Sequence, residues 1–356
     1  MSFSALPKTF RVPAYLFAYV LLGLFAPLTS SPALAQADIA TYQGPDRTQR
    51  LVAGAKKEGT LTIYTSATVD DMTALTVAFE KKYGIKANVW RASSENIIQR
   101  AATEARGGRF DVDLFETDGV AMEAVYREKL LQEVKSPYLA DLIPAAVPPH
   151  KQWIGDRVQI FTAAYNSKLV KKAELPKRYE DLTEAKWKGK LGVEAADNDW
   201  FSAVVTEMGE EKGLKLFREI VAKNGLSVRK GHTLLANLVV SGEVPLALTT
   251  YFYRVLQLKN DGAPIDWFML PPVVARSQGT GMAKKSPHPH AAVLFTDFLL
   301  SDAQSILAGR DFIPTNVKVK PLPEGLNLKF VDPAKLLDEN EKWDRLYKDI
   351  ITNQGR

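Results

Sequence analysis

Three hydroxyl side chains, Thr65, Ser66 and Thr68, lie between a strand-like apolar run that ends at Tyr64 and a helical pattern, Val69 to Tyr83. The first backbone N–H groups of a helix have no partner inside it, and together with hydroxyl groups they can bind a ligand. In open α/β sheets, ligands bind outside the carboxyl ends of the strands. We therefore predict that this loop is part of a ligand-binding site.

Carboxylate and aromatic side chains follow three further strand-like runs. They are Asp118 after Val112 to Phe115, Asp199 and Trp200 after Trp187 to Val193, and Tyr251 and Tyr253 after Val244 to Thr249. If these strand ends face one cleft, the side chains form its walls. The alternative for each is structural: the aspartates as helix caps and the aromatic rings as core packing.

The sequence lacks the motifs of common enzyme classes, since it contains no G-x-S-x-G, H-E-x-x-H, Walker A or G-x-G-x-x-G pattern. We therefore expect no catalysis, and a secreted hydrolase is only a remote alternative. The four histidines have no metal-ligand spacing on one helix face, so we expect surface or capping roles for His150, His232, His288 and His290.

Three arginines, Arg91, Arg229 and Arg254, stand singly near predicted loops or helix starts, where we expect them to be solvated or ion-paired. If one of them faces the cleft, an anionic ligand such as an organophosphonate or carboxylate is favoured, because guanidinium binds these groups through two hydrogen bonds. Stacking on tyrosine and tryptophan would instead favour a cationic or aromatic organic ligand, such as a thiamine-like cation.

Residues 1–35 predict a cleaved export signal. Two basic residues precede an apolar run, Val12 to Leu28, and Ala33-Leu34-Ala35 matches the small-x-small cleavage pattern, so the mature chain should begin near Gln36. An uncleaved membrane anchor is the alternative, but the run is short for a membrane span and contains two prolines. Cleavage would reduce the formal net charge from +5 to +3, a surplus too mild to indicate nucleic-acid binding.

The absence of cysteine excludes disulfides, thiolate metal ligands and a lipid-modified N-terminal cysteine. An exported protein without a lipid anchor is retained by an outer barrier, so we expect it in the periplasm.

The mature chain of about 320 residues exceeds one typical core and predicts two lobes. Strand-like runs alternate with amphipathic helices, which is the pattern of mainly parallel α/β layers. Val158 to Tyr165 and Ala275 to Ala283 are expected to cross between the lobes. The predicted division is 36–160 plus 276–312 for the N-terminal lobe and 161–275 plus 313–356 for the C-terminal lobe.

Six groups of sequence fragments occur in an order and spacing typical of one protein family. They are AKKEGTLTIYTSA, DVDLFETDG, AYNSKLV, WKGKLGVEAADNDWF, SGEVPLALTTYFYR with KNDGAPIDW, and AVLFTDFLLSDAQSILA. In these fragments the chain resembles the family 1 extracellular solute-binding proteins of ABC importers, and most closely the periplasmic ferric-binding branch. The resemblance implies a type II periplasmic binding protein fold that closes on its ligand by a hinge motion.

The resemblance also implies a partial metal-ligand set. Ferric-binding members use a histidine, a carboxylate and two neighbouring tyrosines; the corresponding positions here are Thr68, Asp118, Tyr251 and Phe252. Asp118 and Tyr251 are therefore the candidate metal ligands, and Tyr253 is a substitute for the position that phenylalanine occupies. Carboxylate and phenolate oxygens suit a hard cation, and a metal can ionise a phenol whose free pKa is about 10.

The expected function is that of a periplasmic binding component, a monomer that delivers a small ligand to an inner-membrane permease with separate ATPase subunits. Ferric iron is the leading ligand and would be cargo, so no cofactor is expected. A small organic solute, namely an organophosphonate, a thiamine-like cation or a carboxylate, is the alternative. A sensory use of the same fold is also open.

Overall fold

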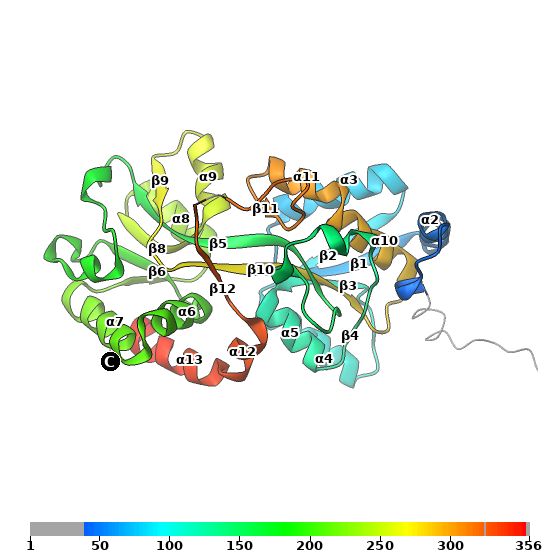
Figure 1. Cartoon of the computed structure of the whole chain (residues 1–356), viewed down its shortest axis with the longest axis horizontal. Helices are drawn as coiled ribbons and strands as arrows, with labels where there is room; N and C mark the ends of the chain where they lie inside the picture. The colour runs from blue at the N-terminus through cyan, green and yellow to red at the C-terminus, as the bar shows by residue number, and fades with distance from the viewer. Residues whose placement is uncertain (1–38, 324, 354–356) are drawn as a thin grey trace, which may run out of the picture.

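A long buried strand, β5 (Ile154–Asn166), runs through both halves of the computed structural model, which describes residues 39–323 and 325–353 (Figure 1). Its first half pairs antiparallel with β10 (Val273–Ala283), and from Phe161 onward it pairs with β8 (Leu246–Tyr251) and β9 (Ile265–Phe268). The expected crossing between two lobes is therefore present, and β10 runs beside it. The predicted export signal lies outside the described residues.

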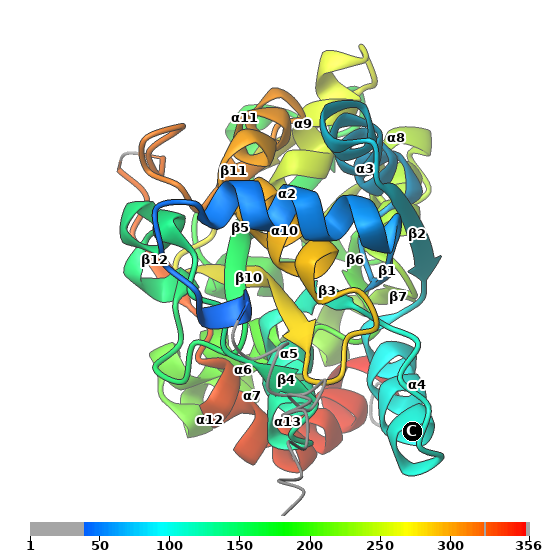
Figure 2. The same ribbon diagram turned by 90° about the vertical axis from the view of Figure 1, so that its right-hand side faces the viewer.

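The N-terminal lobe is built on the sheet order β2-β1-β3-β10-β5. Its first three strands are parallel: β1 (Thr60–Thr65) lies between β2 (Lys86–Arg91) and β3 (Leu114–Asp118). The helices of this lobe are α2 (Arg47–Glu58), α3 (Val69–Tyr83), α4 (Ser94–Arg106), α5 (Gly119–Arg127), α10 (Pro289–Leu300) and α11 (Asp302–Gly309). Helix α10 is buried along almost its whole length, and α2 lies against it (Figure 2).

The C-terminal lobe continues the sheet from β5 through β8 to β6 (Leu191–Glu194) and β7 (Ser227–Arg229). Its helices are α6 (Asn198–Met208), α7 (Glu210–Asn224), α8 (His232–Ser241), α9 (Phe252–Asn260) and α13 (Asn340–Tyr347). Buried aromatic rings dominate the core between sheet and helices, among them Trp187, Trp200 and Phe217. Each lobe thus has a hydrophobic core of its own, as a two-lobed fold requires.

Short elements complete the chain. They are β4 (Leu131–Gln132), β11 (Ile313–Pro314), β12 (Leu328–Phe330), α12 (Pro333–Asp338), the 3-10 helices 137–141, 144–146, 172–174, 179–183 and 185–187, and a terminal π-helical turn, Lys348–Thr352. Helix α12 packs on α5 of the N-terminal lobe, whereas α13 packs on α6 of the C-terminal lobe (Figure 1). We retain the predicted lobe division as a proposal, with the C-terminal segment touching both lobes.

Most predicted elements are present, although several strands differ in their bounds by a few residues. Helix α3 has the predicted bounds because Thr68 caps its start and Gly84 adopts the left-handed conformation, with φ 73°, at its end. The strand predicted from Trp187 begins only at Leu191, because Gly189 turns the chain at φ 71°. The strand predicted to end at Phe115 continues to Asp118, because its polar end pairs with β10.

Among the described residues, no single helix has both the length and the apolar composition of a membrane span; α10 and α11 meet these criteria only as a pair bent by 52°.

Burial of charge on β5 generates a stability prediction. The guanidinium of Arg157 is 2.8 Å from a carboxylate oxygen of Glu116 and 2.8 Å from one of Asp156, and all three side chains are at most 3% exposed. Arg157→Met should lower the free energy of unfolding by about 3–5 kcal/mol, because it leaves two buried carboxylates without a cation. Arg109→Met, which removes a side chain 64% exposed, is the matched control and should cost less than about 1 kcal/mol. Equal losses in urea unfolding would contradict this reading.

Candidate functional site

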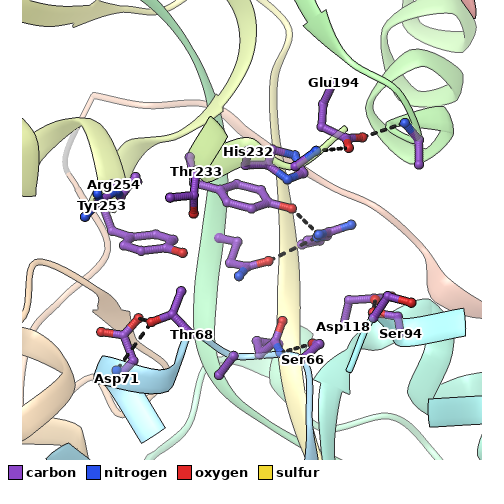
Figure 3. Close-up of a pocket in the computed structure, with 18 of the residues that line it drawn as sticks. Ser66, Thr68, Asp71, Ser94, Asp118, Glu194, His232, Thr233, Tyr253 and Arg254 are labelled. Carbon is purple, nitrogen blue, oxygen red and sulfur yellow. Dashed lines mark hydrogen bonds between the residues drawn. The ribbon is translucent and has the colours of Figure 1, made fainter. Parts of the chain in front are cut away.

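A cavity of about 350 Å³ lies between the lobes, at the carboxyl ends of β1, β3, β6 and β8. Figure 3 shows Ser66, Thr68 and Asp118 on its N-terminal wall, and His232 and Tyr253 opposite them. Tyr251 also lines this cavity. The structure therefore brings five of the eight sequence-predicted site residues to this cavity, namely Ser66, Thr68, Asp118, Tyr251 and Tyr253. A sixth, Asp199, lines an adjoining cavity.

The N-terminal wall is a chain of hydrogen-bonded hydroxyl groups. Ser66 Oγ accepts from Gln278 Nε2 at 3.1 Å and from Thr117 Oγ1 at 3.0 Å, and Thr117 lies 2.8 Å from Ser94 Oγ. The backbone N–H groups of Ser66 and Ala67 are used inside the protein, by Glu116 and Thr65 respectively. Contact between this loop and a ligand is thus left mainly to the hydroxyl groups of Ser66 and Thr68.

Thr68 and Asp118 each cap a helix as well as lining the cavity. Thr68 Oγ1 accepts from the backbone N–H of Asp71, and Asp118 accepts from that of Ala121 at 3.1 Å. Ser94 Oγ donates to the second carboxylate oxygen of Asp118. The sequence left helix capping and ligand contact as alternatives for Asp118. The structure allows both roles, because the side chain that caps α5 also lines the cavity.

Tyr251 is held between a histidine ring and an arginine. The ring of His232 stacks on it at a centroid distance of 3.9 Å and an angle of 21°, and Arg276 donates a hydrogen bond to the phenol oxygen. Burial raises the pKa of Tyr251 well above its ordinary value, and the charge of Arg276 opposes that rise. The phenol is therefore neutral unless a bound cation takes the place of its proton.

Arg276 connects the crossing strands to the C-terminal lobe. Its guanidinium lies 2.6 Å from Asp199 and donates to Gln159 at 3.1 Å, in addition to Tyr251. Burial raises the pKa of Asp199, and the neighbouring charge of Arg276 lowers it. This arginine was missed in the sequence, although the polar residues within the predicted crossing segment from Ala275 to Ala283 were a signal for it.

Two carboxylates on the C-terminal wall were also missed. Glu194 ends β6, and Asp197 precedes α6; both line the cavity beside His232. They directly precede the first turn of α6, which holds the predicted Asp199 and Trp200. Polar residues alone do not reveal which side of such a loop faces the ligand, and His232 was assigned to a surface or capping role that the structure contradicts, because α8 begins at the cavity wall.

Three of the predicted residues are buried and make hydrogen bonds or ion pairs within the protein, so they do not line this cavity. Thr65 is fully buried and its hydroxyl donates to Glu116, so it does not line the cavity. Trp200 lies in the core, where its indole N–H donates to the hydroxyl of Tyr179 at 3.2 Å, as the core-packing alternative expects. Asp199 is 3% exposed and paired with Arg276, which makes it a support of the site and a wall residue of the adjoining cavity.

Positive charge is also present on the cavity wall. Arg91, Lys230 and Arg254 line it, whereas Arg229 pairs with Glu243 outside it. Arg91 donates to the carbonyl of Ala67 and Arg254 to the side chain of Gln257, so each retains further N–H donors. The cavity therefore offers carboxylate, phenol and imidazole groups to a cation, and guanidinium groups to an anion.

Residues 112–339, more than half of the chain, match the family described as bacterial extracellular solute-binding proteins. Among curated proteins, the chain is 26% identical over 287 residues to iron uptake protein A1 of Synechocystis, which covers 76% of this chain and 79% of that protein. It is also 26% identical over 276 residues to the Fe(3+)-binding periplasmic protein of Serratia marcescens, covering 72% of this chain and 81% of the relative.

Solved structures share the two-lobed fold. The Trichodesmium protein IdiA (FutA), in complex with iron and citrate, has a TM-score of 0.67 and 23% identity, covering 82% of this chain and 99% of its own. The periplasmic binding protein AfuA of Actinobacillus pleuropneumoniae, with bound fructose-6-phosphate, has a TM-score of 0.73 and 21% identity, covering 83% of this chain and 99% of its own. The predicted fold is confirmed.

Removal of Arg276 should make stability more dependent on pH. The folded-state pKa of Asp199 is already raised above 3.8, and without Arg276 it rises further, so stability is lost as the pH rises from the unfolded value through the folded one. Arg276→Met should therefore cost about 3–5 kcal/mol near pH 7.5, and less near pH 5, in urea unfolding.

The matched control adds Asp199→Asn to Arg276→Met. This double variant has no carboxylate to protonate at that site, so the extra pH dependence should disappear. A loss of stability that is the same at both pH values in the single variant would contradict the assignment.

Proposed function

We propose that this chain, which belongs to the family of bacterial extracellular solute-binding proteins, is the exported binding component of an ABC importer. It captures a small ligand between its lobes and passes it to an inner-membrane permease whose ATPase subunits supply the energy. The chain performs no chemistry of its own. We further propose that it acts as a monomer in the periplasm, after cleavage of residues 1–35 and without a lipid anchor.

The proposed ligand is ferric iron. The observation that carries this choice is that oxygen donors from both lobes, Asp118 from one and Tyr251 from the other, line the same cavity. Carboxylate and phenolate are hard ligands suited to a small, highly charged cation. The names of the two curated relatives, an iron uptake protein and an Fe(3+)-binding periplasmic protein, support the same choice.

Tyr253 supports the iron proposal because it can replace the second tyrosine of the ferric-binding pattern, whose position Phe252 occupies here. Phe252 packs against the ring of Trp267, with centroids 5.0 Å apart, and is not a cavity residue. Tyr253 instead lines the cavity, and its ring stacks on Phe312 at 4.1 Å. Burial raises the pKa of Tyr253 to about 12, so it too is neutral at neutral pH until a cation ionises it.

A second candidate is an anionic organic solute, such as a phosphorylated compound or an organophosphonate. The observation that favours it is that three cationic side chains, Arg91, Lys230 and Arg254, line the cavity. Guanidinium binds phosphate and carboxylate oxygens in pairs. The structure of AfuA with fructose-6-phosphate gives an example of such a ligand in the same fold.

Ferric iron should give this protein a visible absorption band on addition of ferric citrate, because phenolate-to-iron charge transfer absorbs in the visible range. Tyr251→Phe should weaken the band, and adding Tyr253→Phe should abolish it; both changes should leave the far-ultraviolet circular dichroism spectrum unchanged, since each removes one oxygen and no ring. Tyr165→Phe, a change to a buried tyrosine outside the cavity, is the matched control and should retain the band.

A saturating hundredfold excess of ligand over Kd should also stabilise the wild-type protein by about 2.7 kcal/mol. If ferric citrate produces no band, while a phosphorylated solute stabilises the protein and Arg254→Gln weakens that effect, the anionic candidate replaces iron.

A further inference from the structure

Three potential metal ligands meet on the C-terminal wall of the cavity, apart from the pair predicted from the sequence. They are a carboxylate oxygen of Glu194, one of Asp197 and a ring nitrogen of His232, and these atoms all lie within 4.8 Å of one another. They come from three separate segments, the end of β6, the loop before α6 and the first turn of α8. We infer that Glu194, Asp197 and His232 form a binding site for a first-row transition-metal cation.

The local charge favours a cation at this point. Glu194 and Asp197 are 5% and 2% exposed, so water solvates neither carboxylate well and their negative charge is costly to bury. Within the described residues, the ion pairs of Asp197 include His232 alone, and Glu194 forms no ion pair with lysine or arginine. By contrast, the buried Asp199 nearby has Arg276 at 2.6 Å. A metal cation would supply the positive charge that this pair of carboxylates lacks.

The three side chains are fixed before any metal arrives. The backbone N–H groups of Ala196 and Gly231 donate to the two carboxylate oxygens of Glu194, the second at 2.7 Å. His232 Nε2 lies 2.9 and 3.2 Å from the two oxygens of Asp197, and its ring is stacked on Tyr251. Ligands that are already oriented lose little conformational entropy when the metal binds.

The donor set determines which metals fit. Two carboxylates and one imidazole suit iron, zinc or manganese, and the absence of cysteine excludes thiolate sites. Binding requires His232 to present the lone pair of Nε2, so its remaining proton moves to Nδ1 and any additional proton leaves to solvent. All three residues line the cavity, which leaves the other coordination positions to water, to a small anion or to Tyr251.

The metal site itself does not depend on the proposed function; only the claim that the metal bound there is the transported ligand does. If ferric iron is the cargo, the site explains how the chain binds it although threonine and phenylalanine occupy two positions of the ferric-binding pattern. The C-terminal lobe would then hold the metal alone in the open form, and Asp118 would reach it on closure.

The test is isothermal titration of the full mature chain with Zn²⁺ and, separately, with ferric nitrilotriacetate. Wild type should bind one Zn²⁺ per chain, and Asp197→Asn and His232→Gln should each weaken binding at least tenfold. Glu243→Gln, which removes an exposed carboxylate of the same lobe outside the cavity, is the control and should bind as wild type does. Circular dichroism and the melting temperature without metal report whether each variant folds, and His232→Gln, at the half-buried position, is the safer of the two.

The outcomes separate the site from the function. Zn²⁺ binding that is lost in both variants, without binding of ferric iron, supports the site and rejects iron as cargo. Zn²⁺ binding that both folded variants retain overturns the site, whereas ferric iron binding by wild type leaves the proposed function standing in either case. Failure of wild type to bind either metal overturns the site.

Discussion

The cost of burying charge on the two crossing strands is the constraint on which this structure depends. Strand β5 carries Arg157 and β10 carries Arg276, and both guanidinium groups lie where the lobes meet. An unpaired buried charge lowers the stability of the folded protein, so each guanidinium group needs a carboxylate within hydrogen-bond distance. Arg157 pairs with Glu116 in β3, and Arg276 with Asp199 in α6. The first pair connects the crossing strands to the N-terminal lobe, and the second connects them to the C-terminal lobe.

The two walls of the cavity differ in kind. The N-terminal wall has a network of hydroxyl groups joined to Asp118, and Arg91 also lines it. The C-terminal wall has two buried carboxylates, an imidazole and a phenol supported by Arg276. A small cation would be bound first by the buried carboxylates of the C-terminal wall, because electrostatic attraction is stronger at low dielectric, and would then be enclosed by the hydroxyl groups of the other wall. This order is compatible with a hinge motion about the crossing strands.

The sequence was sufficient for the fold and for part of the site. Periodicity and glycine stops located α3, β1 and the apolar crossing strand, because local backbone preferences and burial decide those elements. Asp118 and Tyr251 were found because they come just after apolar strand-like runs, and in the structure they are the last residues of β3 and β8. Arg276 was not, since a charged residue within a strand is informative only once its partner, Asp199, is known to lie opposite. The cluster of Glu194, Asp197 and His232 joins residues up to 38 positions apart, and no helical or strand spacing relates them.

Native mass spectrometry of the protein purified from its own periplasm would test the central claim most directly, because it weighs whatever the cavity holds. Our account predicts a mature chain that begins near Gln36 and carries one ferric ion, with or without a small anion, which is lost on acidification. A bound organic mass without any metal would contradict the iron assignment.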